Sequence, residues 1–144
     1  MDSKEIANLL YGLYNTQAVQ NYSRCYEMAV SASKQLKKLS ENPNLAKEGK
    51  IAISKLNTKI VSDAKEILSV MGHNEKEKHC FCEYMKTLND PLDRDILYKR
   101  YILGHSWDLV ESSIKKARST IFKRHKRCMI EYLRWRDIYV SNGN

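Results

Sequence analysis

Apolar and small side chains recur at alternating spacings of three and four residues along two long stretches of this chain. The first row consists of Val19, Tyr22, Tyr26, Ala29, Ser33 and Leu36, and the second of Ile53, Leu56, Ile60, Ala64, Ile67 and Met71. This spacing follows the turn of an α-helix and places each row on one helical face. Because the chain holds only 5 Gly and 2 Pro, helices have few interruptions. The sequence therefore predicts an all-α protein.

Three clusters of helix-breaking residues divide the chain: Asn42-Pro43-Asn44, Gly72-His73-Asn74 and Asn89-Asp90-Pro91. They predict an N-terminal helical hairpin over residues 1–74, led by a short helix with Ile6, Leu9, Leu10 and Leu13, and a second domain over residues 75–144. Two long helices with a short connection are expected to lie antiparallel. Pairing of each helix with a second chain as a coiled coil stays open. We expect an intramolecular hairpin that also supports a homodimer.

The second domain is predicted to contain four shorter helices. The first, from about residue 75 to 87, carries an apolar side made of Cys80, Phe81, Tyr84, Met85 and Leu88. Asp90 with Pro91 is a good start for the second, and Gly104 for its end. Ser106 can cap a third helix that opens with Trp107, whose ring is expected to be structural. The fourth begins near Ala117 or Arg118 and continues to Trp135 or beyond.

An aromatic tail ends the fourth predicted helix. It consists of Tyr132, Leu133, Trp135, Ile138, Tyr139 and Val140, which is more apolar surface than a single small motif requires. Two outcomes stay open: the tail contributes to a dimer interface, or it folds back and completes a monomeric core.

Positive charge is concentrated in one segment of the fourth helix. Seven of the thirteen residues 115–127 are Lys or Arg and none is acidic, in a chain whose formal net charge is +8. A short basic helix on an otherwise balanced protein points to a polyanionic partner, most often nucleic acid, although a solvated helix face has the same composition. A short helix, a tight turn and a longer basic helix together match a helix-turn-helix, which binds double-stranded DNA.

Helical angles divide this basic helix into two faces. Ile121, His125, Cys128 and Tyr132 gather on a side that can pack on Val110 and Ile114, and Arg124 beside it is placed to pair with Glu111. For exposed Phe122, packing and contact with a thymine methyl are both open. The predicted DNA-binding residues are Lys115, Lys116, Arg118, Ser119, Thr120, Phe122, Lys123, Lys126 and Arg127.

Residues 87–133 resemble region four of bacterial sigma factors, and more closely the small phage and prophage regulators of the ArpU and RinA type. The resemblance rests on Arg100-Tyr101-Ile102-Leu103-Gly104, on Ser106-Trp107-Asp108 and on the segment from Ala117 to His125. It implies a sigma region-four-like helix-turn-helix and a transcription regulator in a bacterial host cell, with activation of late or packaging genes and RNA polymerase as a further partner.

This chain departs from the pattern in two places. Val110-Glu111 stands where Ile-Ala is usual, and Lys115-Lys116-Ala117 stands in the turn, which therefore lacks its glycine and its serine cap. Two other functions stay open. One is a small terminase-like subunit for DNA packaging. The other is a protein-interaction module that binds RNA polymerase or another regulator.

Other classes of function find little support in the sequence. There is no glycine-rich phosphate loop and no nucleophile elbow, so we expect no enzyme and no cofactor. Cys80 and Cys82 are separated by one residue only and no second pair follows, so we expect no metal site. The N-terminus lacks the layout of a secretory signal and no apolar run approaches a membrane span, which predicts a cytoplasmic protein.

Overall fold

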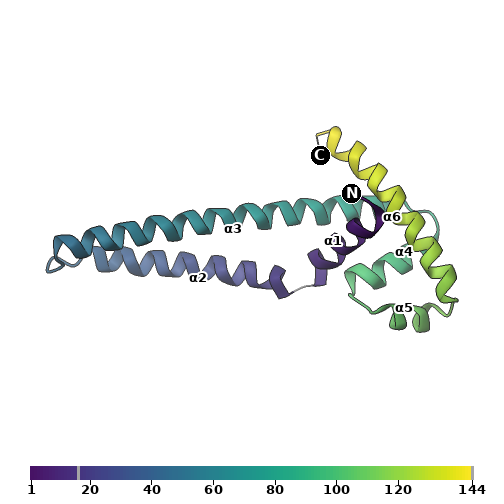
Figure 1. The fold of residues 1–144 in the computed structure, drawn as a ribbon, viewed down its shortest axis with the longest axis horizontal. Helices are drawn as coiled ribbons and strands as arrows, with labels where there is room; N and C mark the ends of the chain where they lie inside the picture. The colour runs from purple at the N-terminus through teal and green to yellow at the C-terminus, as the bar shows by residue number, and fades with distance from the viewer. Residues whose placement is uncertain (16, 144) are drawn as a thin grey trace. The chain divides into compact units, whose positions relative to one another are not determined.

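The computed structural model describes residues 1–15 and 17–143, with the backbone alone for residues 17–20. Its elements are α1 (Ser3–Asn15), α2 (Gln17–Ser40), α3 (Lys47–Thr87), α4 (Pro91–Leu97), the π-helical turn η1 (Tyr98–Ile102), α5 (Trp107–Ile114) and α6 (Arg118–Ser141) (Figure 1). The described residues contain no strand. The predicted all-α class is confirmed.

The chain forms two compact units. Unit 1 comprises residues 1–16 and 74–144, and unit 2, the hairpin, comprises residues 17–73. The predicted domain over residues 1–74 was wrong about its first helix, because α1 belongs to unit 1. Ile6, Leu10 and Leu13 of α1 are buried in the core of that unit. The spacing of these three residues predicts a buried helix face, but it does not say against which of the two units that face packs.

An aromatic cluster forms the centre of unit 1. The ring of Phe81 lies 5.6 Å from that of Tyr101 and 5.3 Å from that of Tyr132, both edge-on, and 6.2 Å from Tyr14. These are favourable geometries for aromatic pairs. Since Phe81 belongs to α3, Tyr101 to η1 and Tyr132 to α6, one ring joins three segments that are far apart in sequence. The predicted apolar side of residues 75–87 is confirmed, with Cys80, Phe81 and Tyr84 buried.

α3 continues through the predicted break at Gly72-His73-Asn74 as one helix of 41 residues. The prediction of a helix end at this position was wrong. A glycine inside a helix costs about 1 kcal/mol relative to alanine. The helix formers on both sides, and the burial of Cys80, Phe81 and Tyr84 just beyond, offset that cost.

The predicted start of α4 is confirmed, and its end differs in form. The Asp90 side chain accepts a hydrogen bond from the Leu92 N–H at 2.9 Å, and Pro91 takes the first helical position. After Leu97 the helix widens into η1, and Gly104 follows with a left-handed φ of 70°. A Cβ atom at Gly104 would collide with the side chain of Asn15, whose Nδ2 donates to the Tyr101 carbonyl at 2.9 Å. Glycine is needed at this position for both reasons.

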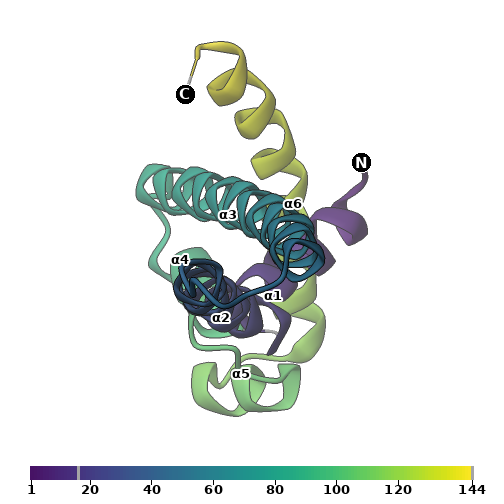
Figure 2. The ribbon, with the colours of Figure 1, turned by 90° about the vertical axis from the view of Figure 1, so that its left-hand side faces the viewer.

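Unit 2 is an antiparallel hairpin of α2 and the first part of α3, as predicted (Figures 1 and 2). The expected row on α2 turns toward α3, with half-buried side chains from Tyr22 onward; Val19 lies outside the described side chains. The Ser33 hydroxyl donates to Asn57 Oδ1 at 2.7 Å across the two helices. No described side chain of this unit is fully buried.

The aromatic tail folds back onto unit 1. Tyr132 is fully buried, and Leu133, Trp135 and Tyr139 pack against the same core. Within the described residues, Glu77 of α3 accepts two hydrogen bonds from Arg136, at 3.0 and 2.5 Å. Only Ile138 and Val140 of the tail remain largely exposed. The tail is thus used mainly to complete its own unit.

The described part of the chain has no helix with both the length and the apolar character that a bilayer crossing requires. All four cysteines are free thiols; Cys80 and Cys128 are buried, and Cys25 and Cys82 are exposed. Burial is the largest cause that raises the pKa of Cys128, to about 11.

Candidate nucleic-acid interface

α5, a turn of three residues and α6 position the basic segment. The Ser106 hydroxyl accepts the Leu109 N–H at 3.2 Å, so its predicted role as N-cap is confirmed. α5 ends at Ile114, and the next residue, Lys115, adopts the left-handed conformation with φ 61° and ψ 40°. Ala117 then precedes α6 without a side-chain cap, as its methyl group requires. The first N–H groups of α6 therefore lack a side-chain acceptor at the cap position.

Lys115 is expected to be strained, because a side chain with a Cβ atom costs about 1 kcal/mol or more in the left-handed region. We predict that Lys115→Gly raises the free energy of unfolding by about 1 kcal/mol in a urea titration. Lys116→Gly is the matched control, because Lys116 is not among the described residues with a positive φ. An equal gain from both substitutions, or none from the first, would contradict this account of the turn.

One side of α6 is anchored in unit 1. Ile121 packs with Ile96 and Val110 in a small apolar cluster, with Trp107 and Ile114 at its edge. The predicted inner face is confirmed, since Ile121, Cys128 and Tyr132 are buried and His125 is largely covered; Met129 is buried as well.

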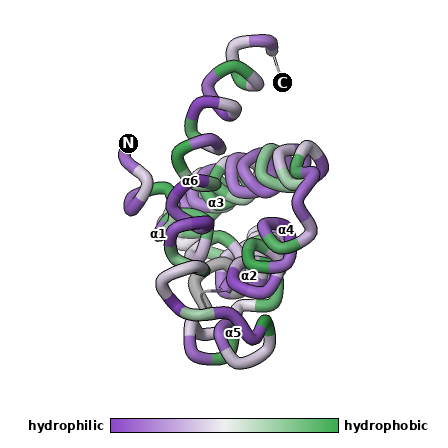
Figure 3. Tube along the Cα trace, turned by 90° about the vertical axis from the view of Figure 1, so that its right-hand side faces the viewer, coloured by the Kyte–Doolittle hydropathy of each residue, from purple (hydrophilic) through white to green (hydrophobic). Residues whose placement is uncertain are grey.

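All nine predicted DNA-binding residues are exposed. They line the turn and the first part of α6: Lys115, Lys116, Arg118, Ser119, Thr120, Phe122, Lys123, Lys126 and Arg127. In the hydropathy colouring, hydrophilic and hydrophobic residues alternate along α6, as a helix with one packed and one exposed face requires (Figure 3). Contact between these nine residues and DNA remains a prediction.

The three arginines of the segment bind carboxylates of the same unit. Arg127 donates to Asp93 Oδ2 at 2.5 Å, and Arg124 donates to Asp90 at 2.6 Å and to Asp93 at 3.2 Å. Asp93 is only 5% exposed. A buried carboxylate needs a partner, and these two guanidinium groups compensate its charge. The hydrogen bond from Arg124, followed by that from the Leu92 N–H, lowers the pKa of Asp90.

The expected pair of Arg124 with Glu111 was wrong. Arg118 instead binds Glu111 at 2.7 Å and also Asp108. Helical angles place Arg124 beside the core face correctly, but they do not say which neighbouring helix lies there. In the structure that neighbour is the start of α4.

The four lysines of the segment differ from its arginines. Among the described residues, no ion pair involves Lys115, Lys116, Lys123 or Lys126. A phosphate could bind them without breaking an existing contact, whereas at Arg127 it would compete with Asp93. The lysines are therefore the cations most available to a polyanion.

Trp107 holds the outer part of this region together. Its ring lies edge-on to Phe122 at 5.0 Å and to His125 at 4.7 Å, and the Arg100 guanidinium lies 4.6 Å from its centre. Phe122 is 41% exposed despite this contact, so it keeps a free surface beside Arg118. Packing accounts for one side of Phe122 and leaves the other open to a ligand.

His125 is held as a neutral ring. Its Nε2 lies 2.6 Å from the Tyr101 hydroxyl, and the two rings stack at 5.8 Å. Burial first, and then the positive charge of Arg100, lower the pKa of His125 to about 4. At neutral pH it therefore adds no charge to the basic segment and acts as a core residue.

The exposed cationic face extends further along α6 than the sequence analysis placed it. A groove of about 370 Å³ is lined by Lys123, Lys126, Arg127, Ile130, Glu131 and Arg134. Arg134 was missed because the dense basic run ends at Arg127. Its spacing of eleven residues from Lys123, which is three helical turns, is the signal that could have found it.

Comparison with protein families, with curated proteins and with solved structures gave no match to this chain. Within the described residues, no group of three or more His, Cys, Asp or Glu side chains could hold a metal ion.

Proposed function

We propose that this protein is a sequence-specific regulator of transcription that binds double-stranded DNA. In this proposal α5 and α6 act as a helix-turn-helix, and α6 enters the major groove. The observation that carries the proposal is the acid-free segment of residues 115–127, whose four lysines have no described ion pair and stand on a helix anchored in a core. Such a surface attracts a polyanion and holds its cations in fixed positions.

The dimensions and chemistry of α6 support this role. A helix about 10–12 Å across fits the major groove, which is about 12 Å wide. Lysines bind phosphates, Ser119 and Thr120 in the first turn can donate to phosphates or bases, and the free side of Phe122 suits a thymine methyl. A phosphate at the start of α6 would also supply the acceptor that Ala117 lacks.

The resemblance to phage and prophage regulators extends the proposal to a bacterial host, to late or packaging genes and to RNA polymerase as a second partner. These finer parts rest on the resemblance of Arg100–Gly104, Ser106–Asp108 and Ala117–His125 alone. Mapping of bound sites across the host genome would identify the operator and the regulated genes.

Salt dependence tests the proposal. We predict that the protein binds a mixed-sequence duplex, and that log affinity falls with log salt at a slope near −4 for each bound chain, as expected if about four phosphates are neutralised. Lys123→Ala should reduce the magnitude of this slope by about 1. Fluorescence anisotropy between 50 and 200 mM salt (about the range where the effect is large) provides the measurement. No binding at low salt, or a slope near zero, would remove nucleic acid as the partner.

A further inference from the structure

The hairpin has a row of uncharged side chains on α2 that is largely exposed in the described structure. The row consists of Asn21, Cys25, Met28, Ala32, Gln35 and Leu39, at spacings of four, three, four, three and four residues. All six lie in α2, none is charged, and all but Ala32 are exposed. Met28 is 65% and Leu39 56% exposed. A charge-free row with this heptad spacing is the pattern of a coiled-coil seam.

A second row on the same helix already serves the contact with α3. It consists of Tyr22, Tyr26, Ala29, Ser33, Leu36 and Ser40, all half-buried. The two rows lie about 100° apart around α2, because each member of one follows a member of the other by one residue. One neighbouring helix can cover only one of them. An arc this wide without a charged side chain is typical of a helix that has neighbours on two sides.

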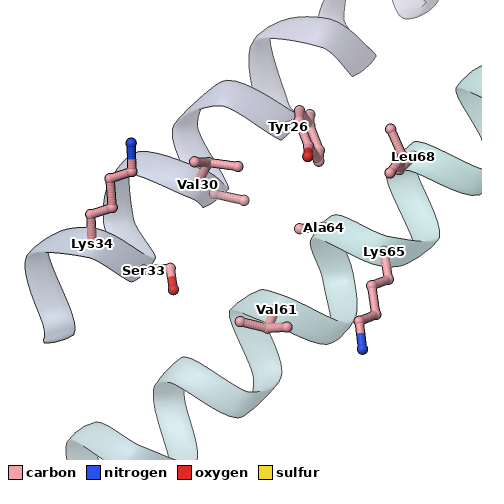
Figure 4. Close-up of a pocket in the computed structure, with 9 residues that line it drawn as sticks. Tyr26, Val30, Ser33, Lys34, Val61, Ala64, Lys65 and Leu68 are labelled. Carbon is pink, nitrogen blue, oxygen red and sulfur yellow. The ribbon is translucent and has the colours of Figure 1, made fainter.

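The contact between α2 and α3 also leaves apolar side chains of the hairpin without a packing partner. On one face of it, a groove of about 290 Å³ separates Tyr26 and Val30 from Val61 and Leu68 (Figure 4). The Lys34 and Lys65 amines point away from this groove. Since no described side chain of residues 21–73 is fully buried, two helices alone leave this unit without a core. Helices gain most of their stability from packing an apolar face.

We propose that the Asn21–Leu39 row packs against the same row of a second copy of this chain, with the two α2 helices parallel and in register. In that arrangement Asn21 meets Asn21 of the second copy and Gln35 meets Gln35. Side-chain amides both donate and accept, so each pair can bond to itself, and a polar pair in a seam fixes its register. An antiparallel pairing would instead set Asn21 against Leu39 and bury the amide without a partner.

The available surface is large enough for a specific dimer. From Asn21 to Leu39 the row is about 27 Å long, and α2 with the adjoining edge of α3 is about 20 Å wide. Such a face amounts to roughly 500 Å² on each copy, and the two together reach about the 1,000 Å² that a specific interface needs. Leu56 on α3 is also half exposed and adds apolar surface to the hairpin.

The chain enters the hairpin at Gln17 and leaves it after His73, and these positions belong to the same end of an antiparallel pair of helices. A parallel dimer would therefore carry both copies of unit 1 from one end. Combined with the proposed DNA binding, and resting on it, this would let two copies of α6 address paired half-sites. The dimer itself is inferred from the hairpin alone.

Cys25 allows a direct test, because a parallel seam places it opposite Cys25 of the second copy within the range that a disulfide bridges. In a Cys82→Ser background, Cys25 is the one exposed thiol of the described residues. We expect mild oxidation without DNA to convert most of the protein to a covalent dimer within minutes, and light scattering to give about twice the 16.8 kDa of one chain.

The matched control moves the thiol by two residues. Ser23 is exposed on the opposite side of α2, so Ser23→Cys combined with Cys25→Ser and Cys82→Ser should give no rapid dimer. A monomer mass at 50 µM (about the upper range for a weak dimer) with no Cys25 bridge would overturn the proposal. Equal bridging from Ser23→Cys, or preferential bridging of Cys25 to a Gln35→Cys site, would overturn the parallel register. Because no DNA is present, these outcomes are independent of the DNA-binding proposal.

Discussion

Trp107→Ala is expected to lower the free energy of unfolding of unit 1 by about 3 kcal/mol. Truncation of a core tryptophan costs about 3–5 kcal/mol, and the half-buried position of Trp107 places it at the low end. The loss removes the edge-on contacts to Phe122 and His125 and the stacking of Arg100. With those contacts gone, α5 and the start of α6 lose the ring that joins them.

Urea unfolding measures this effect, followed by the fluorescence of Trp135, the other of the two tryptophans, which packs on the core of the same unit. Trp107→Phe is the matched control, because it keeps an aromatic ring, and it should lose only about 1 kcal/mol. If Trp107→Ala unfolds at the wild-type urea concentration yet no longer binds DNA, Trp107 is a contact residue and its structural role is wrong.

Local signals in the sequence predicted the parts of unit 1 that depend on nearby residues. Asp90 and Ser106 are recognisable as caps because the side chain and the N–H that it binds lie within three residues of each other. The inner face of α6 follows from the helical spacing of Ile121, Cys128 and Tyr132. These features hold in any fold that contains the same helices.

Features that depend on which elements become neighbours could not be predicted in this way. Arg124 pairs with Asp90 and Asp93, more than thirty residues away, and its expected partner Glu111 is bound by Arg118. Likewise, the apolar row of α1 indicates burial without saying in which core. At Gly72 a local signal was misleading. Glycine often ends a helix, but here α3 continues, because residues that follow Gly72 in the same helix are buried.

The candidate interface likewise combines features that follow from nearby residues with features that depend on which elements become neighbours. Helical angles predicted the exposed side of α6 at Ser119, Phe122, Lys123, Lys126 and Arg127, and the structure exposes these five together with the other four candidate residues. Which of the cations already form ion pairs was not predictable, since the three arginines are held by carboxylates of α5, of α4 and of Asp90, the residue before α4. The DNA-binding proposal therefore rests more on the four lysines than on the three arginines.

Reversing the charge at two of these lysines is expected to abolish most of the affinity for DNA. Lys123 and Lys126 lie on the exposed side of α6 without a described ion pair, and both line the groove that continues to Arg134. Each lost phosphate contact costs roughly 8-fold at about 0.1 M salt, and each new carboxylate adds repulsion. The Lys123→Glu/Lys126→Glu variant should therefore bind about 100-fold more weakly or worse.

The same change of charge elsewhere provides the control. Lys37 and Lys38 are exposed at the end of α2, and Lys37→Glu/Lys38→Glu alters the net charge of the chain equally. All four residues are exposed, so each variant should unfold within about 0.5 kcal/mol of the wild type per substitution. A difference in DNA binding between the two variants thus reports position, not overall charge or folding.

The affinity of these two variants for one mixed-sequence duplex at 50 mM salt (roughly the regime where electrostatic binding is strong) tests the central claim most directly. Binding through the exposed face of α6 predicts a loss of about 100-fold for Lys123→Glu/Lys126→Glu and only a few-fold for Lys37→Glu/Lys38→Glu. Equal losses in both variants, or wild-type affinity in the first, would contradict it.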